Sequence, residues 1–239
     1  MPPIYAIGDV HGQREMLENA FDLIERDEHA GAPVVLVGDF TDRGPDSRGV
    51  IDMLLDGIAA GRPWIPLMGN HDRFLLRFLK DPHYADPRMK TPRNWLAPVV
   101  GGRATLESYG VDADERRALE DIHADALQAI PPSHIAFFES LDTTHLTDDH
   151  VFVHAGIRPG VPLQQQTEDD LIWIRDEFLD DPRDHGRLVV HGHTPTEAPV
   201  HCGNHVNVDG GAGYGRPLIP VLLLGREGWT LSSVGRARL

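Results

Sequence analysis

Five short blocks of polar residues stand where predicted strands end, each with a glycine inside it. The blocks are GDVHG (8–12), GDFTDRG (38–44), GNHD (69–72), HAG (154–156) and HGHT (191–194). Each block carries a carboxylate, an imidazole or an amide, and the glycine permits a tight turn and close backbone approach. Oxygen and nitrogen ligands of this kind suit divalent ions such as Mn²⁺, Fe²⁺ or Zn²⁺. The pattern predicts a metal site where the five strand ends converge.

The elements that position these blocks alternate between strand and helix in the first third of the chain. Short apolar runs predict buried strands at 4–7, 33–37 and 64–68, and helical patterns occupy 13–28 and 47–59. This β-α-β-α-β series implies parallel strands with helices on their faces, and ligands collect at the carboxyl ends of such strands. Further strands are expected at 150–153, 188–190, 205–208 and 217–224, with a helix over 168–179.

The middle of the chain has a different character. Residues 81–98 are rich in proline, charge and aromatic side chains without a clear period, which predicts an irregular loop, whereas 105–109 and 114–130 have helical patterns. We interpret 81–140 as a cap inserted into a single domain that spans 1–239, because no linker or repeat divides the chain.

Composition narrows the class of protein. Acidic residues outnumber basic ones 37 to 22, and the resulting net charge of −15 argues against nucleic acid or an anionic membrane as a partner. The single cysteine, Cys202, cannot form an internal disulfide, and we expect it to have no role unless its thiol is exposed. Without a signal peptide or an apolar stretch near the roughly 20 residues that span a bilayer, the sequence predicts a cytoplasmic protein.

The blocks GDVHG, GDFTDRG, GNHD, HAG and GHTP resemble the signature of the metallophosphoesterase superfamily. More narrowly they resemble the phosphoprotein phosphatase (PPP) family, in particular its bacterial and phage members of the lambda-phosphatase type. Residues 172–175 (IWIR) and 207–211 (NVDGG) extend the likeness over nearly the whole chain. The resemblance implies an α/β fold, a two-sheet sandwich flanked by helices, with a helical or irregular cap insertion.

The resemblance also implies two divalent metal ions, with Mn²⁺ expected first and Fe²⁺ or Zn²⁺ as alternatives. One ion would be held by Asp9, His11 and Asp39, and the other by the shared Asp39 with Asn70, His154 and His193. A carboxylate bridge lets two cations lie roughly 3.5–4 Å apart, and a water between them loses a proton easily. His191 also follows a predicted strand, but the GHTP match selects His193, which leaves His191 to packing or to support of the ligands.

Two arginines and a histidine complete the implied chemistry. Arg43 and Arg175 are expected to clamp phosphate, because a guanidinium matches phosphate oxygens at two points and stays charged. Arg175 lies in the predicted helix over 168–179, where Asp176 is an alternative partner. By resemblance His71 is the general acid that protonates the leaving oxygen, and Asp42 hydrogen-bonds His71 and keeps it protonated.

The function predicted from these residues is hydrolysis of phosphoserine and phosphothreonine in proteins, a binuclear phosphomonoesterase reaction by in-line attack of a metal-bridging hydroxide. One alternative is a symmetrical diadenosine tetraphosphate hydrolase, which shares all five blocks. A non-catalytic metal- or phosphate-binding protein is the other. The substrate, a phosphoprotein or a phosphorylated small molecule, should be selected by the cap, where Tyr84 and Trp95 either stack on adenine or pack the cap, with packing favoured.

Several conspicuous residues receive no catalytic role. Asp72 is one, and the glycine cluster 210–215 is another, because Arg216 stands where a G-x-G-x-x-G motif needs its last glycine. We expect that cluster to be a turn at the rim of the site. The histidines outside the blocks are expected on the surface or in polar packing: 29, 83, 123, 134, 145, 150, 185, 201 and 205.

Overall fold

Strand β1 (Ile4–Ile7) is buried along its whole length, and its side chains alternate between two apolar cores. Successive side chains of a strand point to opposite faces of the sheet. In this computed structural model, which describes residues 2–239, Ile4 and Ala6 face a second sheet. Tyr5 and Ile7 instead pack against the apolar sides of helices α1 (Arg14–Glu25) and α2 (Ser47–Ala59).

The first sheet has six strands in the order β11-β10-β9-β1-β2-β3. β2 (Val34–Leu36) and β3 (Trp64–Pro66) run parallel to β1, which confirms the predicted β-α-β-α-β unit. The last three strands extend the sheet in antiparallel fashion on the other side of β1: β9 (Val221–Leu224), β10 (Glu227–Ser232) and β11 (Gly235–Arg238).

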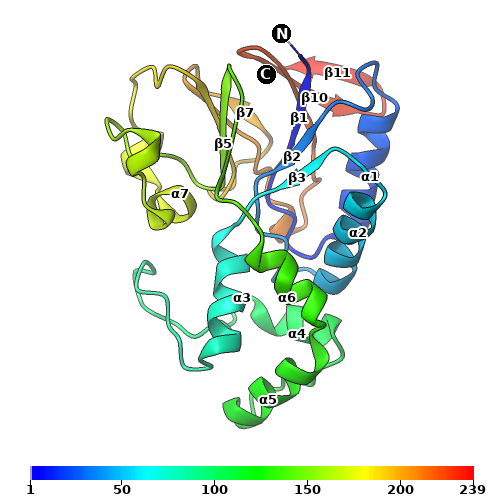
Figure 1. Ribbon diagram of the computed structural model, residues 1–239, viewed down its shortest axis with the longest axis vertical. Coiled ribbons are helices and arrows are strands. Elements are labelled where there is room, and N and C mark those ends of the chain that lie inside the picture. The colour runs from blue at the N-terminus through cyan, green and yellow to red at the C-terminus, as the bar shows by residue number, and fades with distance from the viewer. Residues whose placement is uncertain (1) are drawn as a thin grey trace.

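The second sheet has five strands in the order β4-β5-β6-β8-β7 and packs face to face with the first (Figure 1). Its members are β4 (Thr144–Leu146), β5 (His150–Val153), β6 (Leu188–His191), β7 (Val200–His201) and β8 (His205–Asn207). The short helices α7 (Glu168–Trp173) and α8 (Asp176–Leu179) cover its outer face. The α/β fold with two sheets flanked by helices is therefore confirmed.

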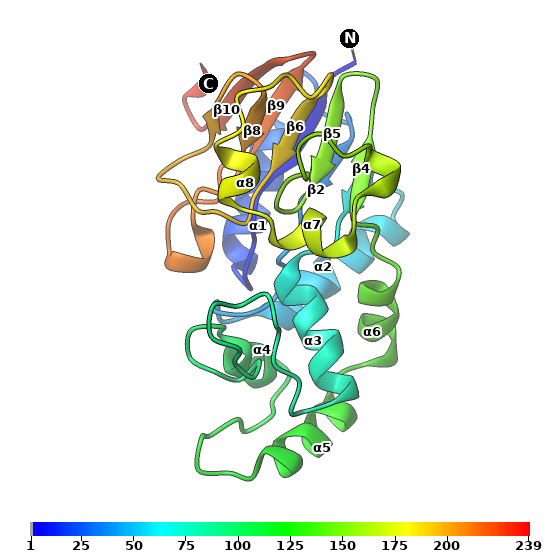
Figure 2. The same cartoon turned by 90° about the vertical axis from the view of Figure 1, so that its left-hand side faces the viewer.

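Four helices lie at one end of the sandwich, away from both chain termini (Figures 1 and 2). They are α3 (Asn70–Lys80), α4 (Gly102–Ser108), α5 (Leu119–Ala129) and α6 (Pro132–Glu139). Buried cap residues such as Trp95 and Phe138 belong to the same apolar cluster as Tyr5 and Ile7 of the sheet. The cap and the sheet thus share one core, while the assignment of 1–239 to a single domain stays a prediction.

Three predicted elements need correction. The helix expected from residue 114 begins only at Leu119, because the Asp114 carboxylate accepts a hydrogen bond from the Arg116 amide and stabilises a turn instead. The strand expected from residue 217 begins at Val221, after two prolines that have no N–H to donate. The helix expected over 168–179 is two helices, α7 and α8, because Ile174 has an extended backbone and packs into the core.

Some elements have no counterpart in the sequence predictions, namely α3, α6, β4, β7, β10 and β11. Two single turns of 3₁₀ helix, Leu163–Gln165 and Ala212–Tyr214, complete the described chain. None of the helices within residues 2–239 combines the length and apolar character needed to cross a membrane. Cys202 is exposed and forms no disulfide.

Candidate active site

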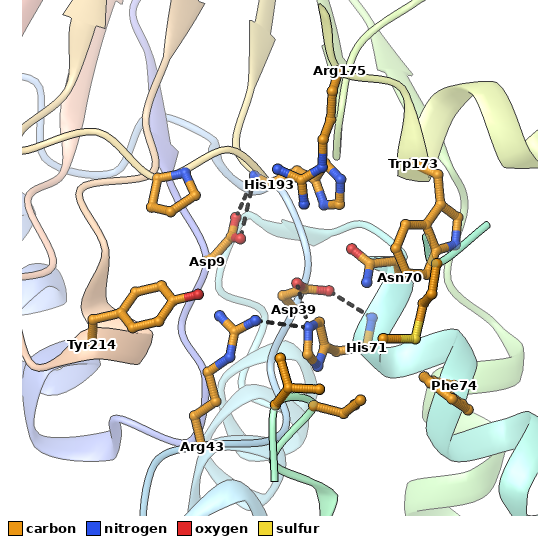
Figure 3. Close-up of a pocket in the computed structure, with 14 residues that line it drawn as sticks. Asp9, Asp39, Arg43, Asn70, His71, Phe74, Trp173, Arg175, His193 and Tyr214 are labelled. Atoms are coloured by element: carbon orange, nitrogen blue, oxygen red, sulfur yellow. Dashed lines mark hydrogen bonds and ion pairs between the residues drawn. The ribbon is translucent and has the colours of Figure 1, made fainter. Parts of the chain in front are cut away.

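The five polar blocks meet at the carboxyl ends of the central strands, as the sequence predicts. Figure 3 shows Asp9, Asp39, Asn70, His71 and His193 around one cavity. Asp9 follows β1, Asp39 follows β2 and His154 follows β5. Two groups of buried side chains have ligand atoms that all lie within 4.8 Å of one another: His11, Asp39 and His71, and Asp39, His154 and His193. Asp39 belongs to both groups, so its carboxylate is placed to bridge two ions.

The backbone is strained at the site. A positive φ is uncommon for residues with a side chain, because Cβ then crowds the backbone. Every non-glycine residue of 2–239 with a positive φ belongs to the predicted site: His11 (46°), Asp39 (54°), Asp42 (75°), Arg43 (67°) and His193 (65°). Strain of this kind persists only where the surroundings over-determine the conformation, and it clusters at functional sites.

Asp72 holds the strained loop after β2 in place. Its carboxylate accepts hydrogen bonds from the amides of Asp39 (2.7 Å), Phe40 (2.9 Å) and Gly69 (3.1 Å). Burial raises the pKa of Asp72 to about 7, and these backbone donors oppose the rise. Asp72 therefore has a positioning role that sequence reasoning missed, although its place directly after Asn70 and His71 was a usable signal.

The imidazoles are oriented as metal ligands. His11 Nδ1 donates to the Thr41 carbonyl (2.7 Å) and His154 Nδ1 donates to the Val37 carbonyl (2.8 Å), which makes Nε2 the nitrogen that carries the lone pair in each ring. This backbone support is typical of metal-binding histidines. Burial lowers the pKa of His11 and His193, and lowers that of His154 to about 3, so the rings are neutral. Neutral imidazole is the form that binds metal.

Two further observations fit a pair of cations. His193 Nε2 is buried without any hydrogen-bond partner, and His154 Nε2 lies 2.9 Å from Asn70 Oδ1 and 3.5 Å from Asp39 Oδ2. Burial raises the pKa of both Asp9 and Asp39, and for Asp9 the nearby carboxylate of Asp209 adds to the rise. Divalent cations bound here would favour the charged form of both carboxylates.

Asp209 was not among the predicted ligands. It is buried beside Asp9, and its carboxylate accepts a hydrogen bond from the Gly211 amide (2.8 Å). The block NVDGG at 207–211 was the signal that could have found it.

His71 and Asp42 form a close pair at the edge of the metal ligands. His71 Nδ1 donates to Asp42 Oδ2 at 2.6 Å, and His71 Nε2 lies 3.1 Å from Arg43 Nη2. Burial raises the pKa of Asp42 to about 7, against hydrogen bonds from Thr105 and Trp95 that lower it. Burial, together with Arg43 and Arg175, lowers the pKa of His71.

A cavity of about 380 Å³ opens over these groups. It is lined by the polar residues Asp9, Asp39, Arg43, Asn70, His71, Arg175 and His193, and by Phe74, Met89, Val99, Val100, Trp173, Pro195 and Tyr214. Figure 3 shows Tyr214 and Arg43 on one side of the cavity and Trp173 and Phe74 on the other. The Arg43 guanidinium lies 4.9 Å from the centre of the Tyr214 ring.

The two predicted phosphate-binding arginines both line this cavity. The sequence placed Arg175 within a helix, but it lies at the break between α7 and α8. Its side chain donates there to Thr194 Oγ1 (3.1 Å). Among residues 2–239 no ion pair joins Arg175 to Asp176. Arg43 Nη1 donates to His11 Nε2 (2.7 Å), so Arg43 and a metal ion compete for this lone pair.

The aromatic residues that line the cavity are not the ones singled out in the sequence. Trp95 is fully buried, and Tyr84 packs edge-on against Phe74, so the prediction that both pack the cap is confirmed. Tyr214, in contrast, is 61% exposed at the cavity mouth. It belongs to the glycine cluster at 210–215, which forms a turn at the rim as expected.

His191 lies inside β6 and points away from the ligand groups. Its ring is fully buried against Phe178 and His205, with ring centres 5.2 and 5.1 Å apart, respectively. His191 joins neither of the groups that could hold a metal, which agrees with the packing interpretation. Of the other histidines, His134 and His150 are buried with hydrogen-bonded rings, which is the expected polar packing.

Comparison with known proteins identifies the family. The family model of the calcineurin-like phosphoesterases matches residues 2–216. A bis(5′-nucleosyl)-tetraphosphatase PrpE [asymmetrical] from Bacillus thuringiensis (strain Al Hakam) is 23% identical over 232 residues, covering 87% of this chain and 85% of that protein. The protein of the same name from Bacillus cereus (strain AH187) is 23% identical over 235 residues, covering 89% of this chain and 87% of that protein.

Solved structures share the fold at low identity. The crystal structure of a putative diadenosine tetraphosphatase has a TM-score of 0.65 at 20% identity, covering 96% of this chain and 92% of that one. A cold-active protein tyrosine phosphatase has a TM-score of 0.65 at 19% identity, covering 100% of this chain and 79% of that one. The family model matches nine-tenths of the chain, and four of the six predicted ligands, His11, Asp39, His154 and His193, lie in the two ligand groups, so this chain belongs to the calcineurin-like phosphoesterase family.

Proposed function

We propose that this phosphoesterase hydrolyses dinucleoside polyphosphates. The observation that carries the proposal is the lining of the cavity, where aromatic and apolar side chains share one space with two arginines and four of the predicted metal ligands. Aromatic side chains stack on nucleobases of any sequence, and arginines bind phosphate oxygens at two points. A substrate with a base at the end of a phosphate chain matches both features, and the curated relatives are named for such substrates.

Each group of site residues has a separate proposed role. Asp9, His11 and Asp39 would hold one divalent ion, and Asp39, Asn70, His154 and His193 the other. We propose Mn²⁺ as the first choice for both. Ions bound there would neutralise phosphate charge and activate water for attack on phosphorus. The chain's own contribution is to bind phosphate oxygens through Arg43 and Arg175, which line the same cavity.

His71 is proposed to protonate the oxygen that leaves. Its Nε2 faces the cavity, and its Nδ1 is held by Asp42. Burial and the two arginines lower the pKa of His71. A bound phosphate adds negative charge between these arginines, and a nearby negative charge favours the protonated ring. We therefore expect bound substrate to favour the protonated form of His71.

The experiment compares three substrates on the Mn²⁺-loaded protein: diadenosine tetraphosphate, a phosphoserine peptide and p-nitrophenyl phosphate. We expect kcat/KM to be at least about a hundredfold higher for the dinucleotide than for the peptide, which corresponds to about 3 kcal/mol. A preference for the peptide would favour the serine/threonine phosphatase predicted from the motifs. No turnover of any of the three would favour a non-catalytic binding protein.

The products of the dinucleotide reaction decide where it is cut. Two molecules of ADP would indicate the symmetrical hydrolysis considered from the sequence, and ATP with AMP the asymmetrical one for which the curated relatives are named. Chromatography of the nucleotides at early time points distinguishes the two patterns.

A further inference from the structure

We propose that Trp95 and Thr105 are positioning residues that aim the Asp42 carboxylate at His71, so that the cap sets the orientation of the general acid. The inference rests on the role of His71 in the proposed function. Trp95 lies in the irregular part of the cap and Thr105 in α4, more than 50 residues beyond Asp42 in the chain.

The Asp42 carboxylate is surrounded by donors from the cap. Trp95 Nε1 lies 3.0 Å from Oδ1 and 2.9 Å from Oδ2, and Thr105 Oγ1 donates to Oδ1 at 2.8 Å. His71 Nδ1 donates to the same carboxylate at Oδ2, at 2.6 Å. All four side chains are buried, so water does not compete for these bonds. The cap therefore determines which way the carboxylate faces.

Thr105 also holds the backbone of Asp42. The Asp42 amide donates to Thr105 Oγ1 at 2.8 Å, and the Ser47 hydroxyl lies 3.2 Å from the same oxygen. Asp42 has a φ of 75°, a conformation that needs support from its surroundings. The Asp42 amide also lies 3.2 Å from Ser47 Oγ, so the Thr105 hydroxyl supports both the backbone and the side chain of Asp42, with Ser47 as a second acceptor for the backbone.

Two glycines let the cap approach this closely. A Cβ on Gly102 would lie 2.5 Å from the indole of Trp95, and a Cβ on Gly101 would lie 2.7 Å from the Arg43 amide nitrogen. The Gly101 carbonyl accepts a hydrogen bond from that same amide at 3.2 Å. The start of α4 therefore touches both the support of the general acid and the backbone of a phosphate-binding arginine.

These contacts matter because a buried carboxylate that bonds Nδ1–H of a histidine fixes the tautomer and the ring orientation. A carboxylate free to rotate would leave His71 Nε2 aimed less well at the leaving oxygen. The resulting loss of activity should depend on the leaving group of the substrate, because a poor leaving group needs a proton and a good one does not. This dependence separates a positioning role from a purely structural one.

The kinetic test uses the Mn²⁺-loaded protein with phenyl phosphate, a poor leaving group, and p-nitrophenyl phosphate, a good one. Thr105→Val removes the hydroxyl at nearly constant shape, and we expect kcat for phenyl phosphate to fall about tenfold or more, within the range of general acid catalysis, with little change for p-nitrophenyl phosphate. Thr105→Ser keeps the hydroxyl and should restore most of the activity. KM should change little in either variant.

The control is Tyr109→Phe, which removes a buried hydroxyl of the same cap that is bonded to His134 Nδ1 (2.8 Å) and not to Asp42. It should lower the melting temperature without changing the ratio of the two rates. Equal loss on both substrates in Thr105→Val, or the same ratio in Thr105→Val and Tyr109→Phe, would overturn the inference.

The variant His71→Asn distinguishes a failure of the positioning role from a failure of the proposed general acid. If His71→Asn slows phenyl phosphate more than p-nitrophenyl phosphate and Thr105→Val does not, the positioning role fails while the acid assignment stands. If His71→Asn affects both substrates equally, or loses metal, the assignment of His71 fails.

A readout without turnover follows the His71–Asp42 bond directly. In ¹H NMR of the Zn²⁺-loaded protein, the His71 Nδ1 proton should give a far-downfield resonance, assigned by its absence in His71→Asn. We expect Thr105→Val and Trp95→Phe to broaden or shift it, and Thr105→Ser and Tyr109→Phe to leave it in place. An unchanged resonance in folded Thr105→Val and Trp95→Phe would refute the positioning role.

Discussion

Replacement of Tyr214 by alanine is expected to weaken the reaction with dinucleotides selectively. The Tyr214 ring is 61% exposed at the cavity mouth, with the Arg43 guanidinium 4.9 Å from its centre. The ring therefore has surface to offer to a base whose phosphates reach Arg43. Stacking of a base on an aromatic side chain contributes about 1–3 kcal/mol. At about 1.4 kcal/mol per factor of ten, the variant should lose about 5- to 140-fold in kcat/KM for diadenosine tetraphosphate.

The assay needs a substrate that meets the same arginines without a ring, such as glycerol 2-phosphate. Loss of the Tyr214 ring also removes its contact with Arg43, which is worth about 0.5–1 kcal/mol at an exposed site. That smaller effect is common to both substrates and cancels in the ratio of their kcat/KM values. Tyr214→Phe keeps the ring and should retain the preference for the dinucleotide.

The reasoning would be refuted by an equal loss on both substrates in Tyr214→Ala, because the residue would then act only through Arg43. It would also be refuted by a Tyr214→Phe variant as impaired as Tyr214→Ala, because the hydroxyl and not the ring would then be the determinant. Binding of a non-hydrolysed dinucleotide analogue, measured by calorimetry, should follow the same order.

Further predictions concern metal binding and stability. Asp72→Asn should reduce metal affinity about 10- to 100-fold, because Asp72 holds the Asp39 loop and such a loss is usual for a group that orients ligands. Titration with Zn²⁺ measures the affinity, and an undiminished affinity would contradict the positioning role of Asp72. His193→Ala should lower the metal content from two ions per chain towards one, as determined by elemental analysis. Asp27, bonded to Arg236 and Tyr5, has its pKa lowered from 3.8 to about 2, so its stabilisation is complete above pH 3.8 and is lost as the pH falls towards 2. Asp27→Asn should therefore flatten the acid limb of urea-unfolding midpoints against pH, and an unaltered slope there would count against this ion pair.

Much of the site could be predicted because its signals are local in the sequence. Glycine next to Asp9, Asp39 and Asn70 marks the turns after the strands, and apolar runs before each turn mark the buried strands. Parallel strands bring their carboxyl ends to one edge, so local signals were enough to gather the ligands.

The remaining features depend on packing between distant segments. Nothing in the sequence near Trp95 indicates that its indole donates to Asp42, 53 residues away, or that Tyr214 takes the exposed place at the cavity mouth. The break before Arg175 was also hidden, because Ile174 continues a helical pattern while its side chain is drawn into the outer core. Long-range contacts of this kind override local propensity.

The shared core of sheet and cap has a consequence for engineering the enzyme's selectivity. Phe78, Trp95 and Phe138 are buried in the cluster that also contains Tyr5 of the central strand. Grafting the cap of a relative onto this sheet would leave cavities or clashes in that cluster, each costing on the order of 1–5 kcal/mol. Exposed positions at the cavity mouth, such as Val99 at 64% exposure, carry no such penalty. Libraries that vary the rim and keep the cap's interior are the practical route to new substrates.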